Sequence, residues 1–445
     1  MSLPCTSVVT ASQDGLPQSL RYTYWHDFDP RISVAFRPFR DNKTVIRAGF
    51  GIFTQTMLGP LAYTSIGIPL GAPYTYVNDN NGQPLFQFPQ TSPANQALQY
   101  GGTGFYDAMD PHFKDPQTAQ WNVTVERELT PATAVRITYA GMNSYRMNVT
   151  EDYNAISPSM QPYVPSPYVD PRAPYQNWVQ IYASRNAGFA NYQGVSFETT
   201  HRMSKGLSFQ ANYTFARNLS DAQGDAPGGF VPEVLLFTPT ADQFDLRLAR
   251  GNVAGMPRQR FLFTGTYELP YGPQRNWESR NKFVNGVLGG WNFNTVTLLQ
   301  TGPWLTPTIS PTEDQSNTDI VGRGGITLRP DWVDNPASPG GGVLYNINAF
   351  APTPANAGRI GNAGVGILQG PGTIAVSAGL SKVFPVRERA RFRFEATFTN
   401  ALNRTNFAPP ATNVSSPATF GVLQSAQTAG QGGNRTGQLA LRMDF

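Results

Sequence analysis

The sequence has little cysteine, few charged residues and no long hydrophobic run. Cys5 is the only cysteine among 445 residues, which excludes an internal disulfide and a cysteine-based metal cluster. Charged residues make up 14% of the chain, where about 25% is ordinary. The formal charge of +4 comes without Lys/Arg runs, so we expect no nucleic-acid partner. No stretch approaches the roughly 20 apolar residues of a membrane-spanning helix.

Catalytic and targeting motifs are lacking as well. His26, His112 and His201 are scattered along the chain, and no Ser lies in a Gly-x-Ser-x-Gly turn. We therefore expect no enzymatic activity, metal or cofactor. Residues 1–5 contain neither a basic nor an apolar leader segment, so the sequence predicts either a cytoplasmic protein or a chain whose true start lies upstream.

Glycine, proline and aromatic residues are abundant instead. The chain has 43 Gly and 38 Pro, and 12% of its residues are Phe, Tyr or Trp. This aromatic content is too high for a disordered chain, which cannot bury enough apolar surface to fold. The composition predicts a folded all-β protein made of strands and turns.

Apolar and polar residues alternate with a period of two. Phe392, Phe394 and Phe398 alternate with polar residues, and the last ten residues repeat the pattern. In total the pattern predicts about eleven half-polar strands. The other segments with this pattern are 32–36, 46–52, 121–126, 135–139, 195–198, 207–217, 261–269, 291–299 and 374–380.

Short and long connections alternate between these segments. The short ones include Ser204–Gly206 and Pro385–Glu388. The long, Gly/Pro/Asn-rich ones are 54–117, 143–192, 218–257, 301–372 and 401–435. Outer-membrane barrels have tight periplasmic turns on one rim and long external loops on the other. The alternation predicts an antiparallel sheet with strands in sequence order and Phe445 at the periplasmic rim; a soluble β-sandwich stays open as an alternative.

The two sides of each strand predict two environments. We expect one set of side chains to face lipid: Phe392, Phe394, Phe398, Phe209, Tyr213, Phe261 and Tyr267. A second, polar set should face the lumen: Arg391, Arg393, Glu395, Arg442 and Asp444. The members of this ladder either pair across strands within the wall or contact what fills the lumen.

Several motifs resemble TonB-dependent receptors of the Oar-like type. Phe28–Arg31, Ala35–Phe39, Lys43–Arg47 and Gly49–Phe53 are similar to the middle of the barrel in that family. Further matches follow in the family's order at 120–123, 204–207, 211–217, 267–272, 289–291, 299–302, 391–395, 398–403 and 406–407. The resemblance therefore covers nearly the whole chain.

The resemblance implies a transmembrane β-barrel of about 22 strands, plugged by an N-terminal domain and powered by TonB. The present chain matches roughly the second half, with an irregular start over 1–27 and barrel over 28–445; it contains neither plug nor TonB box. Taken alone, it should form an open, curved sheet.

The implied location is the outer membrane of a Gram-negative bacterium. The implied partners are membrane lipid, the plug and N-terminal barrel half, the TonB system and the outer-membrane assembly machinery. That machinery would read an assembly signal in the last strand: Leu439, Leu441, Met443 and Phe445. The implied function is uptake of a scarce solute, which the loops do not specify; the alternative is a secreted β-rich adhesin or glycan-binding protein.

Overall fold

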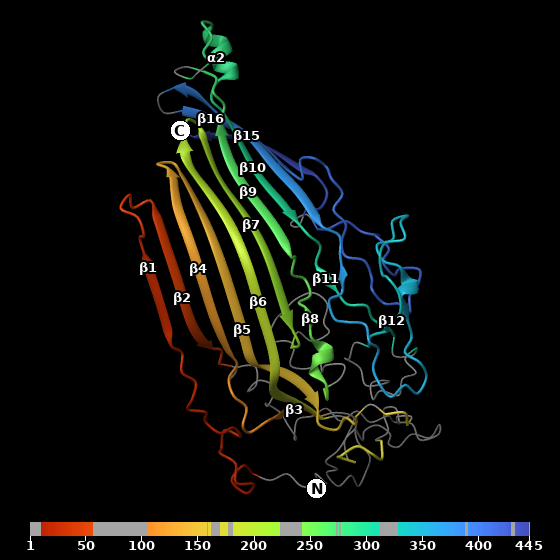
Figure 1. The fold of residues 1–445 in the computed structure, drawn as a ribbon. Coiled ribbons are helices and arrows are strands. Elements are labelled where there is room, and N and C mark those ends of the chain that lie inside the picture. The colour runs from red at the N-terminus through yellow and green to blue at the C-terminus, as the bar shows by residue number, and fades with distance from the viewer. Residues whose placement is uncertain are drawn as a thin grey trace, which may run out of the picture.

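One large sheet dominates the molecule. The structure, a computed structural model, describes residues 10–56, 105–157, 159–161, 170–176, 181–222, 243–272, 275, 277–310, 313, 328–387, 390–428 and 432–444. Within these residues the strands form one 13-stranded sheet and two small two-stranded sheets. Figure 1 shows the long strands of the large sheet lying side by side in a single layer.

The strands of the large sheet follow one another in sequence order. Each predicted segment overlaps one of these strands. Their order across the sheet is β1 (Arg31–Phe36), β2 (Thr44–Thr54), β4 (Gln117–Thr130), β5 (Thr133–Asp152), β6 (Ile181–Ser204), β7 (Leu207–Ser220), β9 (Gln259–Glu268), β10 (Trp291–Gln300), β15 (Thr373–Arg387), β16 (Ala390–Thr399) and β17 (Thr436–Asp444).

All neighbours along this path pair antiparallel. In the described residues β1 pairs only with β2 and β17 only with β16, so the sheet is open. The predicted all-β, antiparallel and open arrangement is confirmed. β1 and β17 run in the same direction, away from the rim where the long loops lie (Figure 1).

Short turns gather at one rim and long connections at the other (Figure 1). We call them the short-turn rim and the long-loop rim. Between β6 and β7, Lys205 and Gly206 both have positive φ angles, of 50° and 81°. Two consecutive positive φ angles define the tight turn whose twist matches that of a β-hairpin. The C-terminal end of the chain lies at the short-turn rim (Figure 1).

β5 and β6 are longer than the sequence predicts. They contain 20 and 24 residues, far more than the roughly 9–11 that cross a bilayer. The predicted loop 143–192 is correspondingly shorter, because both strands continue past its boundaries. β3 (Phe105–Met109) pairs in parallel with the N-terminal end of β6. β8 (Gly251–Asn252) pairs with the C-terminal end of β7.

The long connections contain structure of their own. We call residues 301–310, 328–372 and 401–428 the loop cluster. It contains β11 (Trp304–Leu305) paired with β14 (Leu368–Gln369), β12 (Asp331–Trp332) paired with β13 (Phe350–Ala351), and the 3-10 helix η4 (Ile347–Ala349). Elsewhere in the described residues the helices are the 3-10 helix η2 (Leu246–Ala249) and the α-helix α2 (Lys282–Leu288).

The larger of the two buried hydrophobic clusters in the described residues lies in the loop cluster, not in the sheet. Tyr345, Phe350, Leu368 and Phe420 are buried together there, although they come from two separate connections. Val414 packs against this cluster and against a smaller one around Ile309. Segments 301–372 and 401–435, predicted as loops, therefore pack against each other through a shared core.

Residues 10–30 contain turns and extended backbone without a helix or strand. Among the predicted residues, Phe445 lies outside the described residues, as do Glu388 and most of segment 54–117. None of the helices in the described parts of the chain has the length and apolar character needed to cross a membrane.

Candidate functional site

The predicted lipid-facing residues share one face of the sheet. Directly opposed residues of antiparallel neighbours project to the same side. Phe392 lies opposite Met443, and Phe394 opposite Leu441. Following the pairing from strand to strand places the whole set on one side: Phe392, Phe394, Phe398, Tyr267, Phe261, Tyr213 and Phe209. We call this side the apolar face and the opposite side the polar face.

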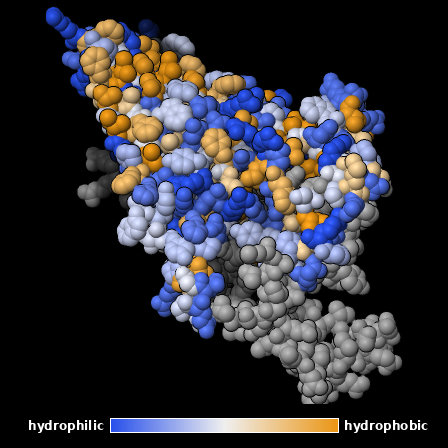
Figure 2. All heavy atoms as spheres, turned by 60° about the horizontal axis from the view of Figure 1, so that its bottom comes forward, coloured by the Kyte–Doolittle hydropathy of each residue, from blue (hydrophilic) through white to orange (hydrophobic). Residues whose placement is uncertain are grey.

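Side chains of the apolar face partly cover one another. Phe398 and Tyr267 are exposed, whereas the other five predicted residues are half-buried. Their neighbours provide the cover: the ring of Phe209 stacks 5.9 Å from that of Phe263, and Trp291 meets Phe394 edge to face at 6.1 Å. None of the seven lies in a closed core. On the side of the molecule seen in Figure 2, hydrophobic side chains gather at one end, while hydrophilic ones cover much of the remainder.

The last strand carries the predicted assembly signal. Leu439, Leu441 and Met443 alternate on the apolar face of β17, and Leu439 and Leu441 are 71% and 70% exposed. They are more open than the phenylalanines of β16 because β17 has a neighbour on one side only in the described residues.

The predicted polar ladder shares the polar face, and its register places two like charges opposite each other. Arg393 lies directly opposite Arg442, a like charge, while Glu395 lies opposite Ala440. The ion pair shown for Arg393 is with Glu395 on the same strand, at 3.8 Å between Nη1 and Oε1. Arg391 is opposite Asp444 along the backbone. The alternating pattern gave the face of these residues but not their register.

A continuous charged ladder lies elsewhere on the polar face, across β2, β4, β5, β6 and β7. Arg47 Nη1 donates to Glu126 Oε2 at 3.0 Å, and Arg136 Nη2 donates to the same oxygen at 3.1 Å. Arg136 Nη1 also donates to Glu198 Oε2 at 3.2 Å. Gln210 Nε2 then donates to Glu198 Oε1 at 3.1 Å. Arg136 is the residue that joins the two carboxylates.

Sequence reasoning missed this ladder. Its members occupy polar positions of predicted strands, but alternation alone does not say which residues lie opposite one another. Glu126 lies opposite Arg136 across the short turn between β4 and β5, whereas Arg136 and Glu198 lie opposite each other on strands that a long connection joins. Counting back from the short turn was the signal that could have linked Glu126 to Arg136.

Replacing Arg136 by Met is expected to destabilise the folded protein by about 1 kcal/mol, because two partly exposed carboxylates lose their shared cation. The Arg136 side chain is 44% exposed, so the effect should shrink as salt rises. Urea unfolding of the full-length protein in detergent at low and high salt measures it. Arg47→Met is the matched control, since Glu126 keeps Arg136; equal losses in the two variants would contradict the bridging role.

The polar face is hollowed between β6 and β16. A hollow of about 610 Å³ is lined by hydroxyl and amide side chains that include Ser208, Gln210, Thr266, Asn294 and Thr397. Thr266 Oγ1 donates to Asn294 Oδ1 at 2.9 Å, which links β9 to β10 within this lining. The lining of this hollow is thus mainly uncharged, in contrast to the charged ladder beside it.

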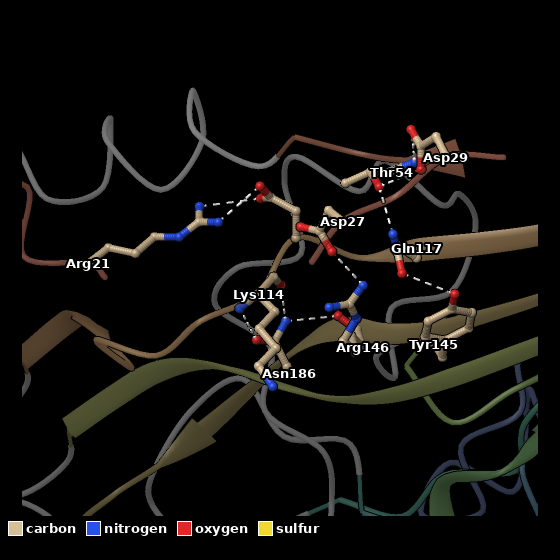
Figure 3. Close-up of polar contacts among 10 residues, drawn as sticks. Arg21, Asp27, Asp29, Thr54, Lys114, Gln117, Tyr145, Arg146 and Asn186 are labelled. Atoms are coloured by element: carbon tan, nitrogen blue, oxygen red, sulfur yellow. Dashed lines mark hydrogen bonds and ion pairs between the residues drawn. The ribbon is translucent and has the colours of Figure 1, made fainter. Parts of the chain in front are cut away.

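Ion pairs fasten residues 21–29 to the long-loop rim (Figure 3). Arg21 Nη2 lies 2.9 Å from Asp115 Oδ2, and Arg146 Nη2 lies 2.8 Å from Asp27 Oδ1. Thr54 Oγ1 donates to Asp29 Oδ1 at 2.8 Å. Arg146 has a φ angle of 57° at an irregularity of β5, where Asn186 Nδ2 donates to its carbonyl at 2.9 Å. The irregularity in β5 therefore coincides with the ion pair between Arg146 and Asp27, which belongs to the segment that precedes β1.

The loop cluster contains a bidentate ion pair. Arg359 Nη1 and Nη2 donate to the two carboxylate oxygens of Asp331, each at 2.7 Å, and the Asn362 N–H donates to Asp331 Oδ1 at 2.9 Å. The hydrogen bonds from Arg359 hold the pKa of Asp331 below its ordinary value. The pair joins β12 to the segment before β14.

This pair predicts how the loop cluster responds to acid. Because the folded-state pKa is depressed, the stabilisation is present above the ordinary Asp pKa of about 3.9 and is lost as the pH falls through the folded-state value. The protection factors for hydrogen exchange over residues 328–368 should be steady from neutral pH down to that range and then fall. In Asp331→Asn this acid-dependent fall should be absent; a transition well above the ordinary Asp pKa would contradict the assignment.

In the described residues no group of three or more His, Cys, Asp or Glu side chains could hold a metal ion.

Solved structures that match the chain include three outer-membrane proteins. The outer membrane transporter YddB from Escherichia coli matches with a TM-score of 0.46 and 8% identity, over 94% of this chain and 40% of that one. The siderophore receptor PiuA from Acinetobacter baumannii has a TM-score of 0.42 and 9% identity, over 93% and 35%. The FrpB iron transporter from Neisseria meningitidis has a TM-score of 0.39 and 8% identity, over 93% and 39%. The chain thus spans less than half the length of these structures.

No curated protein matches the chain. The family model described as outer membrane beta barrel domain matches residues 5–438, which is almost the whole sequence. The chain therefore belongs to the outer membrane beta barrel domain family, and its location is the outer membrane.

Proposed function

We propose that the chain is the C-terminal part of the barrel of an outer-membrane TonB-dependent transporter that takes up a scarce solute. In this proposal the apolar face contacts lipid, the polar face lines the lumen and the long-loop rim is external. The observation that carries it is the difference between the two faces across the whole width of one sheet. The charged ladder from Arg47 to Gln210 and the hollow beside it both lie on the polar face.

The TonB-dependent step rests on the sequence resemblance. In the complete receptor a plug and the N-terminal part of the barrel would fill and close the lumen, and TonB would pull on the plug. The exposed alternation of Leu439, Leu441 and Met443 supports the role of the last strand in barrel assembly. The external loops would capture the solute, and the loop cluster is the packed part of them.

A secreted adhesin accounts less well for the apolar face. A soluble β-sandwich buries one face of each sheet against the other. Here Leu439 and Leu441 remain open, and in the described residues no second large sheet covers the apolar face. Lipid accounts for that exposure without a further protein layer.

The test uses the receptor gene that contains this chain, expressed in a Gram-negative host with and without TonB. We expect a heat-modifiable protein in the outer membrane and uptake of one member of a labelled solute panel only when TonB is present. The panel spans carbohydrates, peptides and metal chelates. Uptake that is equal without TonB, or a secreted soluble product, would refute the proposal. The chain alone, given a secretion signal, should be degraded or aggregate, because unpaired strand edges in lipid are unfavourable.

A further inference from the structure

The connection between β9 and β10 is built differently from the tight turn between β6 and β7. It contains α2, whose first N–H groups are capped by Asn281: Oδ1 accepts from the Phe283 N–H at 2.9 Å. Asn285 holds the preceding segment, since its Oδ1 accepts from the Ser279 N–H at 2.8 Å and its Nδ2 donates to the Ser279 carbonyl at 2.7 Å. The Trp277 N–H donates to the Pro270 carbonyl at 2.9 Å. The connection is thus a fixed structure.

The C-terminal end of α2 is fastened to the apolar face. Lys382 Nζ donates to the carbonyls of Gly286 and Val287 at 2.5 and 2.8 Å, where the helix dipole favours a cation. Trp291 Nε1 also donates to the Val287 carbonyl, at 2.9 Å. Lys382 and Trp291 are opposed residues of β15 and β10, on the same face as Phe394. Lys382 is only 3% exposed, because α2 and the neighbouring rings cover it.

The side chains that α2 and its preceding turn leave uncovered are apolar. Phe283 is 77% exposed and Trp277 is 64% exposed, and Val287 and Leu288 are exposed as well. Phe283 and Val287 are four residues apart and share one side of the helix. Between Trp277 and Phe283 the exposed charged residues are Glu278, Arg280 and Lys282, so the cations outnumber the anion. If this connection lay in water, these apolar side chains would remain exposed to solvent.

We propose that α2 and Trp277 form an interfacial anchor, which inserts these apolar side chains into the boundary between headgroups and acyl chains of the periplasmic leaflet. Two observations select phospholipid as the occupant. The anchor is continuous with the apolar face through Lys382 and Trp291, and Arg280 and Lys282 complement anionic headgroups. Tryptophan and amphipathic helices with basic residues favour this layer of a membrane. The inference depends on the outer-membrane location and is independent of TonB.

The test measures the depth of Phe283 in a bilayer. A nitroxide is placed at position 283 by Phe283→Cys in a Cys5→Ser background of the full receptor. The receptor is reconstituted in vesicles of phosphatidylethanolamine and phosphatidylglycerol. We expect the ratio of oxygen to nickel-chelate collision rates to be at least about five times that at Lys205→Cys, the water-exposed reference at the β6–β7 turn. Val287→Cys, labelled in the same way, should behave like position 283.

Leu441→Cys on the apolar face reports whether the barrel is inserted at all. An oxygen-rich signal at position 441 together with nickel-accessible signals at positions 283 and 287 would overturn the anchor and leave the membrane assignment intact. Protection of those two positions only after periplasmic extract is added would also overturn it, in favour of a protein partner. A nickel-accessible position 441 would contradict both the anchor and the lipid role of the apolar face.

Discussion

Arginine in place of Leu439 is expected to lower the free energy of unfolding by ~2–4 kcal/mol, the range for a cation placed on the lipid side of a barrel near the bilayer centre. Leu439 lies near the middle of β17, on the apolar face, opposite Ala396. Its side chain is largely uncovered by protein, so the new charge would meet hydrocarbon. The fraction of the protein that is heat-modifiable in outer-membrane preparations, and its urea midpoint, measure the loss.

The neighbouring residue provides a matched control. Gln438 lies opposite Thr397 on the polar face, so Gln438→Arg adds the same side chain to the same strand on the other side. We expect this variant to fold nearly as well as the parent. Similar losses from the two substitutions would show that the strand tolerates no arginine at all. Tolerance of Leu439→Arg would mean that the apolar face does not contact lipid.

Gly302→Ala should open the loop cluster. A Cβ atom at Gly302 would lie 1.7 Å from the Gly370 carbonyl oxygen, a contact with backbone that no side-chain rotation relieves. The Gly370 N–H donates to the Pro303 carbonyl at 2.8 Å, so the two chain segments cannot separate without losing this bond. Overpacking of this kind costs about 1–3 kcal/mol. We expect faster hydrogen exchange and proteolysis over residues 344–368, with the long strands still protected.

Gly286→Ala is the control for this substitution. Gly286 lies inside α2, and a Cβ atom there would meet nothing within 4 Å, so alanine should be tolerated. If Gly302→Ala leaves the protection of Leu344, Tyr345 and Leu368 unchanged, then the close approach of Gly302 to Gly370 is not what holds the loop cluster together.

The sheet could be predicted from the sequence because its signal is local. Alternation in segments such as 390–398 identifies a strand and both of its faces without any knowledge of neighbours. The pairing partners follow from turn geometry, which the sequence states clearly only at tight turns such as Lys205–Gly206. The register between β16 and β17 could not be read for this reason: a long connection separates the two strands, and the structure places Arg393 opposite Arg442 and Arg391 opposite Asp444.

The loop cluster could not be predicted, because its core comes from residues far apart in the chain. Tyr345 and Phe420 meet edge to face at 6.2 Å, yet each lies in a Gly/Pro-rich connection without periodicity. The same holds at the long-loop rim, where Arg146 reaches Asp27 from an irregularity in β5. Such contacts depend on how the sheet places the connections relative to one another. This placement produces no pattern within the sequence of a single segment.

The shared direction of β1 and β17 limits what can complete the wall. Two copies of this chain in the same orientation would bring β17 of one copy to β1 of the other, and both seams would be parallel. Bacterial outer-membrane barrels are antiparallel throughout. Antiparallel seams between the copies would require one of them to be inverted, with its long loops on the periplasmic side. Antiparallel closure from β17 round to β1 therefore takes an odd number of intervening strands, of which the first and the last run opposite to β17 and β1. A second copy in the same orientation supplies an odd number of strands along this path, but its outer strands run in the wrong direction.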